Sequence, residues 1–297
     1  MLSKCIACGH TDYQQIRDHV RHNIKIPVYR CMHCGLENLD SPPMNYNEEY
    51  RTLYTPEYGK EFTPAELHET YLKMQGYKIH SINNEYQLEK NQEILDVGCA
   101  TGYLVERLRP FVKHAYGFEV REDDVAFAQQ RGLDVFDEWD DVPVVDRITC
   151  THVLEHVTTP EHLLIHMFEH LKPNGHLYLS VPNRNDAMLT VYESKPYAEW
   201  WYEEPHRWYF TPEALRLLIE RVGFRGKVVY QQRVNVLNHM HWMFTSEQQV
   251  KELQRTGPPI VCGDHRVNTC WCQIDAAYKK TLEQHGLTDN MIYSATR

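Results

Sequence analysis

The sequence has no apolar run approaching the roughly 18 residues that a membrane-spanning helix needs. Residues 1–5 lack the apolar segment of a secretory signal, which leads us to expect a cytoplasmic protein. A basic region is also missing, since the formal net charge is -10 and lysine and arginine gather on no segment. Proteins that bind a phosphate backbone usually carry such a region. We therefore expect neither a membrane span nor a nucleic-acid partner.

Nine cysteines are present, and without an export signal they are not expected to form a disulfide framework. Four of them stand as two pairs, Cys5 with Cys8 and Cys31 with Cys34, and 22 residues separate the pairs. This spacing is typical of a zinc ribbon, in which two tight turns place four thiolates around one ion. We expect structural zinc with a filled ligand shell; two disulfides or four unrelated core cysteines are the alternatives. His10 and His33 lie beside these cysteines but are surplus to the shell.

The chain is expected to divide into four parts: a zinc-ribbon module (1–40), a helical, tyrosine-rich segment (41–90), an α/β domain (91–245) and a C-terminal extension (246–297). From residue 93 onward, short apolar runs alternate with amphipathic helices, which indicates βαβ units and a parallel sheet. We expect strands at 93–97, 115–120, 133–136, 146–150, 176–181 and 227–236. Helices are expected at 103–109, at 123–131, from 160 to a terminus in 171–175, at 212–222 and at 274–285.

A glycine turn, Gly98 to Gly102, follows the first of these strands. The carboxyl end of that strand is where open parallel sheets bind nucleotides, and glycine permits close approach of the backbone. Glu119 ends the next strand, where a carboxylate can accept the hydroxyls of a ribose. Asp137 follows the third strand, where a carboxylate can accept from an adenine amino group. The turn lacks the G-x-G-x-x-G pattern of pyrophosphate sites, which disfavours NAD and FAD.

With these features the sequence resembles the class I S-adenosylmethionine (SAM)-dependent methyltransferases, in the branch of type 11, 12 and 23 domains. The resemblance covers residues 93–236 and implies a Rossmann-like α/β domain with seven strands. One departure is Ala100, where many members have glycine. The matching segments occur in the expected order: 95–102, 117–119, 153–157, 171–175, and 210–212 through 223–224.

The resemblance also implies which residues bind SAM. The turn at Gly98 would hold the amino-acid end, Glu119 the ribose, and Asp137 with the Phe136 backbone the adenine, while His152 would lie by the sulfonium. The full expected set is Asp96, Gly98, Cys99, Gly102, Phe118, Glu119, Asp137 and His152. Asp96 is alternatively a strand-end residue that bonds the loop, and Asp137 one of several solvated charges.

Methyl transfer is an in-line displacement that depends on positioning, and an oxygen or carbon acceptor also gains from a general base, commonly histidine. Most of the 18 histidines must be incidental. We expect His206 or His156 as the base, because in related enzymes both segments border the active site. A hydrogen-bonded structural histidine is the alternative in each case.

The segment 192–209 is crowded with tryptophan and tyrosine among charges and prolines, which is irregular for a core element. Flat aromatic faces suit stacking on sugars or bases, so we interpret the segment as an acceptor lid. Packing against the tyrosine-rich region 46–77 is the alternative. Near the C-terminus, Cys262, Cys270 and Cys272 follow the spacing of no strong ligand template.

The order of a zinc-binding unit, a helical segment and a SAM domain resembles bacterial sugar methyltransferases of surface-glycan and natural-product pathways. We therefore expect methyl transfer to a small-molecule acceptor, a nucleotide-linked sugar or a surface-glycan precursor. One alternative is an RNA or protein methyltransferase that grips its target through the zinc ribbon. The other is a non-catalytic SAM-binding protein. The acceptor atom and the oligomeric state are not predicted.

Overall fold

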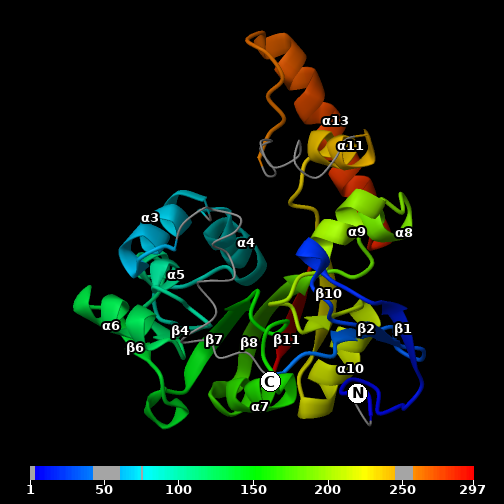
Figure 1. Cartoon of the computed structure of the whole chain (residues 1–297). Coiled ribbons are helices and arrows are strands. Elements are labelled where there is room, and N and C mark those ends of the chain that lie inside the picture. The colour runs from blue at the N-terminus through cyan, green and yellow to red at the C-terminus, as the bar shows by residue number, and fades with distance from the viewer. Residues whose placement is uncertain (1–3, 43–60, 75, 245–256) are drawn as a thin grey trace. The chain divides into compact units, whose positions relative to one another are not determined.

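The computed structural model describes residues 4–42, 61–74, 76–244 and 257–297 (Figure 1). The chain divides into two compact units, each assembled from separate stretches of sequence. Unit 1 comprises Met1–Ser41, Ser180–Leu218 and Val228–Ile292; unit 2 comprises Pro42–Leu179, Ile219–Lys227 and Tyr293–Arg297. The four-part division expected from the sequence places its boundaries elsewhere and stays a prediction. Much of the tyrosine-rich region 46–77 and the start of the C-terminal extension lie outside the described residues.

The larger sheet has seven strands in the order β10-β11-β8-β7-β4-β5-β6. Strand β4 pairs in parallel with both β5 and β7, and β5 pairs in parallel with β6. These findings confirm the Rossmann-like α/β class with seven strands. The bounds are β4 Glu93–Val97, β5 His114–Phe118, β6 Asp134–Phe136, β7 Val145–Thr151, β8 Leu171–Pro182, β10 Arg225–Gln231 and β11 Asn290–Thr296.

Strand β4 is buried on both faces, as expected of a central parallel strand that is covered on both sides. Ile94 and Leu95 are fully buried, and Val97 is nearly so. Val97 lies beside both Phe118 of β5 and Cys150 of β7 in the parallel register. The carboxyl ends of neighbouring strands therefore meet at one edge of the sheet, which is where the candidate site lies.

The helices of unit 2 that bear on this edge are α3, α4, α5 and α6, and α3 contacts the other three. In Figure 1, α3 and α4 (cyan) lie beside α5. Helix α7 begins at Pro160, which suits the first helical turn because its missing N–H has no partner to lose there. The bounds are α3 Pro64–Met74, α4 Gly76–Tyr86, α5 Tyr103–Leu108, α6 Glu122–Gln130, the short 3-10 helix η2 Trp139–Asp141, and α7 Pro160–Glu169.

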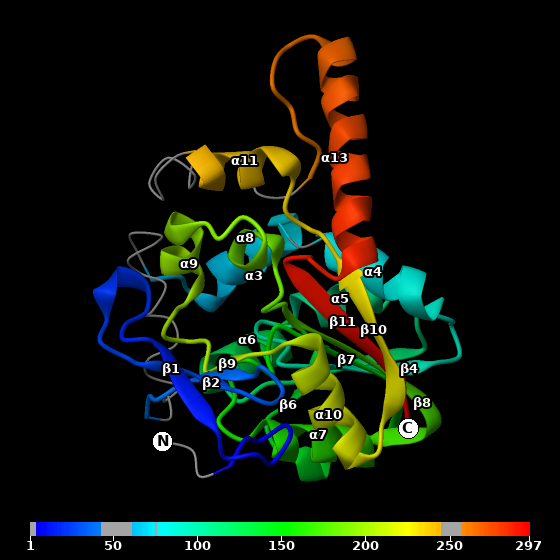
Figure 2. The same ribbon diagram turned by 90° about the vertical axis from the view of Figure 1, so that its right-hand side faces the viewer.

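Unit 1 contains a four-stranded antiparallel sheet in the order β1-β2-β3-β9. The last strand comes from a distant part of the sequence and pairs with β3. Figures 1 and 2 show helix α11 beside the long helix α13. The bounds are β1 Tyr13–Arg17, η1 Arg21–Asn23, β2 Val28–Cys31, β3 Glu37–Leu39, α8 Ala187–Thr190, α9 Lys195–Trp201, β9 Trp208–Tyr209, α10 Pro212–Val222 (assigned to this unit as far as Leu218), α11 Val236–Phe244 and α13 His265–His285.

The aromatic segment 192–209 forms core rather than a lid. Trp201 and Tyr209 are buried in one hydrophobic cluster with Val20, Val28 and Leu39 from the N-terminal module. The expectation of an acceptor lid is therefore wrong for these buried aromatics. The alternative, packing against residues 46–77, falls largely outside the described residues and stays a prediction. A module of about 40 residues cannot bury enough apolar surface alone, so this later segment completes its core.

Three predicted elements differ at their ends. Residues 171–175 were expected to end a helix, but α7 ends at Glu169 and these residues begin β8. Their turn-like composition misled the prediction: Asn174 does have a positive φ of 62°, but the strand continues through it, and the Gly175 carbonyl accepts from the Arg297 N–H (3.1 Å). The strand expected at 227–236 ends at Gln231, and α13 starts nine residues before the expected 274. Strand β11 was not predicted, because its partners lie more than 50 residues away.

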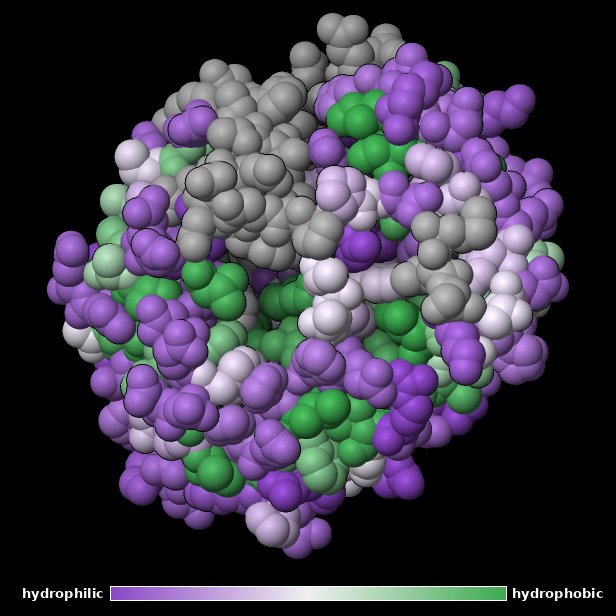
Figure 3. All heavy atoms as spheres, turned by 60° about the horizontal axis from the view of Figure 1, so that its bottom comes forward, coloured by the Kyte–Doolittle hydropathy of each residue, from purple (hydrophilic) through white to green (hydrophobic). Residues whose placement is uncertain are grey.

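None of the described helices has the length and hydropathy of a membrane span. On the face drawn in Figure 3, hydrophilic residues surround separate hydrophobic areas.

Candidate functional site

The turn after β4 is built on residues with positive φ. Gly98 and Gly102 have φ of 71° and 76°, and Ala100 between them has 47°. A Cβ on Gly98 would lie 2.3 Å from a methyl carbon of Val153. Glycine is therefore required at position 98 for two reasons: a Cβ would clash with Val153, and the positive φ is unfavourable for other residues.

Hydrogen bonds tie this turn to strand β5. The N–H groups of Gly98 and Cys99 both donate to the Phe118 carbonyl, at 2.8 and 3.1 Å. The Ala100 N–H donates to a carboxylate oxygen of Glu119 at 2.8 Å. These three amides are engaged within the protein. What the turn offers a ligand is therefore a backbone that can be approached closely.

Glu119 links the two loops at this edge of the sheet. Besides Ala100, its carboxylate accepts from the N–H groups of Val120 (2.8 Å) and Arg121 (3.1 Å). Only 8% of Glu119 is exposed, and this burial raises the pKa of its carboxyl, against the lowering effect of the three donors. An ionised carboxylate has about four acceptor positions, so capacity for a further donor remains.

Asp96 lies one strand position before Val97 and is also buried. Its carboxylate accepts from the Thr149 hydroxyl at 2.8 Å. Burial raises the pKa of Asp96 to about 7, and the Thr149 hydrogen bond and the positive charge of Lys78 oppose that rise. Thr149 and Asp96 are direct partners in the parallel register of β4 and β7. This contact joins the two strands behind the turn.

Of the other residues predicted to bind SAM, Phe118 and Cys99 are buried, whereas Asp137 is exposed. Phe118 is buried and stacks on Trp139 at 4.0 Å between ring centroids, and the Phe136 carbonyl accepts from the Glu119 N–H. Cys99 is 1% exposed, and burial raises the pKa of its thiol, so it acts as a small apolar group. Asp137 is exposed in the loop that follows β6.

His152 follows β7 with φ of 57°, an unfavourable value for a residue with a side chain. Its Nδ1 lies 3.1 Å from Oε1 of Glu155, which is fully buried. Where Glu155 is the acceptor of this contact, Nδ1 is the donor and Nε2 carries the lone pair. Non-glycine residues held at positive φ cluster at functional sites. His152 and Glu155 thus form a dyad with the geometry of an oriented base.

Two residues of the covering helices were missed from the sequence. His68 of α3 is 1% exposed; its Nδ1 lies 3.1 Å from the Thr101 carbonyl and its Nε2 3.1 Å from a Glu106 carboxylate oxygen. Lys78 of α4 donates to the Tyr103 hydroxyl at 2.9 Å and to Thr151 at 3.1 Å. A single sequence carries no clear signal for either position, because the helix face that meets the turn is set by packing.

The two predicted bases lie in different units. His156 of unit 2 donates its backbone N–H to the Val153 carbonyl at 3.0 Å. His206 of unit 1 has its Nε2 3.2 Å from a Glu203 carboxylate oxygen, and burial together with the Arg21 charge lowers its pKa to about 3. His206 is therefore neutral at pH 7, but it is a weak base.

The four N-terminal cysteines come together in unit 1. Their sulfurs lie within 4.8 Å of one another, with 3.6 Å between Cys5 and Cys34 and 3.5 Å between Cys8 and Cys31. The two turns match, since Gly9 donates to the Cys5 carbonyl as Gly35 does to that of Cys31. Among the described residues, no group of three potential metal ligands includes Cys262, Cys270 or Cys272.

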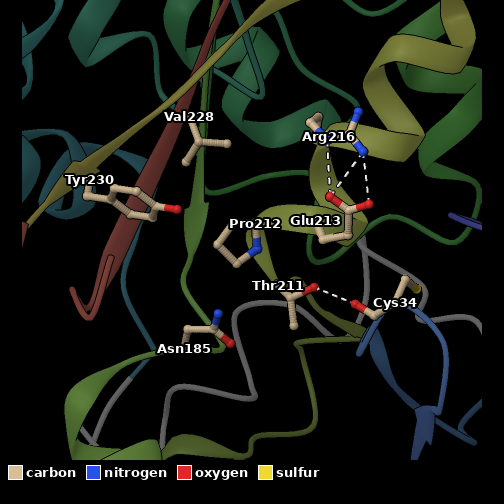
Figure 4. Close-up of a pocket in the computed structure, with 8 residues that line it drawn as sticks. All are labelled: Cys34, Asn185, Thr211, Pro212, Glu213, Arg216, Val228 and Tyr230. Carbon is tan, nitrogen blue, oxygen red and sulfur yellow. Dashed lines mark hydrogen bonds and ion pairs between the residues drawn. The ribbon is translucent and has the colours of Figure 1, made fainter. Parts of the chain in front are cut away.

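Unit 1 also holds an open pocket of about 580 Å³ (Figure 4). The Thr211 hydroxyl donates to the Cys34 carbonyl at 2.7 Å, and Glu213 pairs with Arg216 at 2.8 Å. A Cβ on Gly35 would lie 3.0 Å from the Thr211 methyl, so the cysteine module packs tightly on the start of α10. The lining residues are Cys34, Asn185, Thr211, Pro212, Glu213, Arg216, Val228 and Tyr230, none of them a predicted SAM ligand.

Comparisons with known proteins agree with this geometry. The model of a methyltransferase domain family matches residues 71–229, more than half of the 297 residues. The ubiquinone biosynthesis O-methyltransferase of Coxiella burnetii (strain Dugway 5J108-111) is 34% identical over 107 residues, which are 32% of this chain and 46% of the relative. Its namesake in Rickettsia canadensis (strain McKiel) is 29% identical over 123 residues, 36% of this chain and 50% of the relative.

The chain thus spans about half the length of these curated relatives. Among solved structures, a SAM-dependent methyltransferase from Archaeoglobus fulgidus aligns with 84% of this chain and 100% of its own. The TM-score of that alignment is 0.49 and the sequence identity 16%.

Proposed function

Since the chain belongs to the methyltransferase domain family, we propose that it transfers the methyl group of SAM to a hydroxyl group of a small molecule. The observation that carries the proposal is the Glu119 carboxylate, buried and bonded to the glycine turn at the common edge of β4 and β5. The named activity of the curated relatives, O-methylation in ubiquinone biosynthesis, supports an oxygen acceptor.

The residues present suit SAM, which supplies an electrophilic methyl group when bound. Glu119 retains acceptor capacity for ribose hydroxyls, and the Phe118–Trp139 stack offers apolar surface near the adenine position. Asp137 follows β6 and would accept from the adenine amino group. Lys78, whose ammonium lies at the ends of β4 and β7, would attract the amino-acid carboxylate. Gly98, Cys99 and Gly102 would allow close approach, and Asp96 would hold the turn from behind.

Three histidines are candidates for the general base. His152 is favoured by its bond to Glu155, which leaves Nε2 able to accept a proton from a hydroxyl acceptor. Its role would then differ from the sulfonium contact implied by the family resemblance. His206 and His156 stay candidates, although the low pKa of His206 makes it a poor base near pH 7. Replacement of each by glutamine, with kcat measured against pH, separates them: only the base should lose a limb of the profile.

The acceptor expected from the sequence was a sugar, and it stays a proposal. Its support is the resemblance of the domain order to sugar methyltransferases, while the aromatic segment no longer contributes because its largest side chains are buried. An oxygen acceptor that is not a sugar gains support from the named activity of the relatives, O-methylation in ubiquinone biosynthesis. An RNA acceptor is disfavoured by the net charge of -10.

The cysteine cluster fits zinc. A tetrahedral ion with Zn–S bonds of about 2.3 Å requires sulfurs about 3.8 Å apart, close to the observed 3.5 and 3.6 Å. Cys5, Cys8, Cys31 and Cys34 would fill the shell, so the ion would supply folding energy and no catalytic position.

The test is transfer of labelled methyl from SAM to a panel of nucleotide sugars, catechols and tRNA, with the E119A variant as the inactive control. We expect product with a hydroxylated small molecule and none with tRNA. Tight SAM binding without product from any panel member or cell extract would support a non-catalytic SAM-binding protein. Absence of SAM binding in calorimetry would refute the proposed site.

A further inference from the structure

We propose that Cys8, His10 and His33 form a second metal site, in which the Cys8 thiolate bridges to the ion of the four-cysteine cluster. The three residues offer one sulfur and two ring nitrogens that all lie within 4.8 Å of one another. One thiolate and two imidazoles with an open fourth position is a ligand set that zinc accepts. The bridge rests on the zinc assignment proposed above; the histidine pair does not.

His10 is already oriented as a metal ligand. Its Nδ1 lies 3.3 Å from the Cys8 carbonyl. A carbonyl oxygen only accepts, so Nδ1 carries the proton and the lone pair is on Nε2. Metal-binding histidines usually donate their other ring N–H to a carbonyl or carboxylate in this way, which fixes the tautomer. The backbone of the first cysteine turn thus prepares Nε2 for an ion.

His33 reaches the same place from the second cysteine turn. Its ring stacks on that of His10, with 3.6 Å between centroids and 10° between planes. Within the described residues His33 makes no other contact that would commit its nitrogens. Both residues are exposed, so His33 can turn to chelate and gives up only the ring contact, while His10 keeps its contact with the Cys8 carbonyl. Side-chain rotations of exposed residues are fast, so the site can form without backbone movement.

Charge favours a second cation at this position. Four thiolates around one divalent ion leave a net charge of about minus two on the first cluster. Cys8 is the half-buried member of that cluster, whereas its other three cysteines are buried. Its sulfur is therefore the one that a cation approaching from solvent can reach. Exposed ligands and an open position make the second site the weaker and more labile of the two.

The experiment is a Co²⁺ titration of the full-length, reduced protein, followed by the visible absorption of thiolate-bound Co²⁺. We expect two steps in the wild type and only the first step in the double variant His10→Gln with His33→Gln. Each single variant should weaken the second step at least about tenfold. His22→Asn, which changes another exposed histidine of the same module, is the matched control and should keep both steps.

The outcomes separate the two assignments. One step in wild type and double variant alike overturns the second site but leaves the four-cysteine site intact. No step in either protein overturns both. A double variant that loses the first step overturns the proposal, because its histidines would then belong to the first site. Histidine ring signals in ¹H–¹⁵N spectra, recorded with Zn²⁺ on the single variants, show whether Nε2 of the remaining histidine binds even if the double variant folds poorly.

Discussion

At the scale of single residues, Glu119 is the side chain on which the site depends most. It accepts from the Ala100 N–H on one loop and from the Val120 and Arg121 N–H groups on the other. Glu119→Ala removes these bonds together with the proposed ribose contact. Because hydrogen bonds to a charged group are each worth about 1.5–3 kcal/mol, we expect SAM to bind about a hundredfold more weakly in calorimetry. Glu138→Gln, which changes an exposed carboxylate after β6, should bind SAM as the wild type does.

Asp96 should make stability depend on pH. Its folded-state pKa of about 7 lies above the usual value of an aspartate, which describes the unfolded chain, so the folded protein holds this proton more tightly. The resulting stabilisation is complete below about pH 4 and is lost as pH rises through 7. Asp96→Asn cannot ionise but can still accept from Thr149.

We therefore expect the wild type, measured by urea unfolding, to lose stability relative to Asp96→Asn between about pH 4 and pH 7. The Lys78 charge should reduce this pH-dependent loss of stability. The test is to compare Lys78→Met with the double variant Asp96→Asn, Lys78→Met over the same pH range. A constant difference between wild type and Asp96→Asn across this range would mean that Asp96 stays ionised in the fold.

At the scale of elements, α3 holds the glycine turn through one buried residue. His68 contacts the Thr101 carbonyl and Glu106, so it ties helix α3 to the turn and to the start of α5. We expect His68→Ala to raise the KM for SAM about tenfold, because loss of its contacts with Thr101 and the Glu106 carboxylate loosens the turn by about 1.5 kcal/mol, with a smaller change in kcat. Glu69→Gln, on the exposed neighbouring position, is the control. A tenfold loss of kcat with an unchanged KM would mean instead that His68 acts in the methyl-transfer step.

The aromatic core gives a separate prediction for α9. Trp201 is 6% exposed and packs on Tyr209 at 4.7 Å between centroids. Large buried aromatic side chains replaced by alanine usually cost about 3–5 kcal/mol, so Trp201→Ala should lower the unfolding free energy of unit 1 by that amount. Tyr192→Ala removes a half-exposed ring of the same segment and should cost much less. If instead Trp201→Ala folds stably and raises the acceptor KM, the lid interpretation regains support.

The features that could be predicted from the sequence are those whose interacting residues lie close together along the chain. The β4–turn–α5 unit could be predicted because an apolar run and the glycines of the turn lie within about ten residues. The cysteine pairs could be predicted because two residues separate the cysteines of each pair. His68 and Lys78 were missed, since which helix face meets the turn depends on packing that a single sequence does not state. The Glu155 partner of His152 was within reach, because the two residues stand three apart.

At the scale of the whole molecule, the cysteine module and the aromatic segment 192–209 share one hydrophobic core and one sheet, so we expect them to fold together. Val20, Val28 and Leu39 share a core with residues of α9 and β9, and β3 pairs with β9. Strand β3 begins three residues after Cys34, so the ion proposed at the cysteines would hold one side of this core in place. The sequence suggested separate domains at this point, because pairing between residues 37 and 209 leaves no local signal.

Removal of the proposed metal should therefore destabilise segments that are distant from the cysteines in the sequence. We expect a strong chelator, added under reducing conditions, to speed amide hydrogen exchange in β2 and β3 and also in residues 195–209, where no cysteine lies. Amides of β4, β5 and β7 belong to unit 2 and should keep their protection, because their core is built from other residues. Cys262→Ser, which changes an exposed cysteine outside the cluster, should exchange as the wild type does before and after chelation. Faster exchange confined to residues 4–40 would mean that α9 and β9 are stable without the module, and equal acceleration throughout would mean that the two units unfold as one.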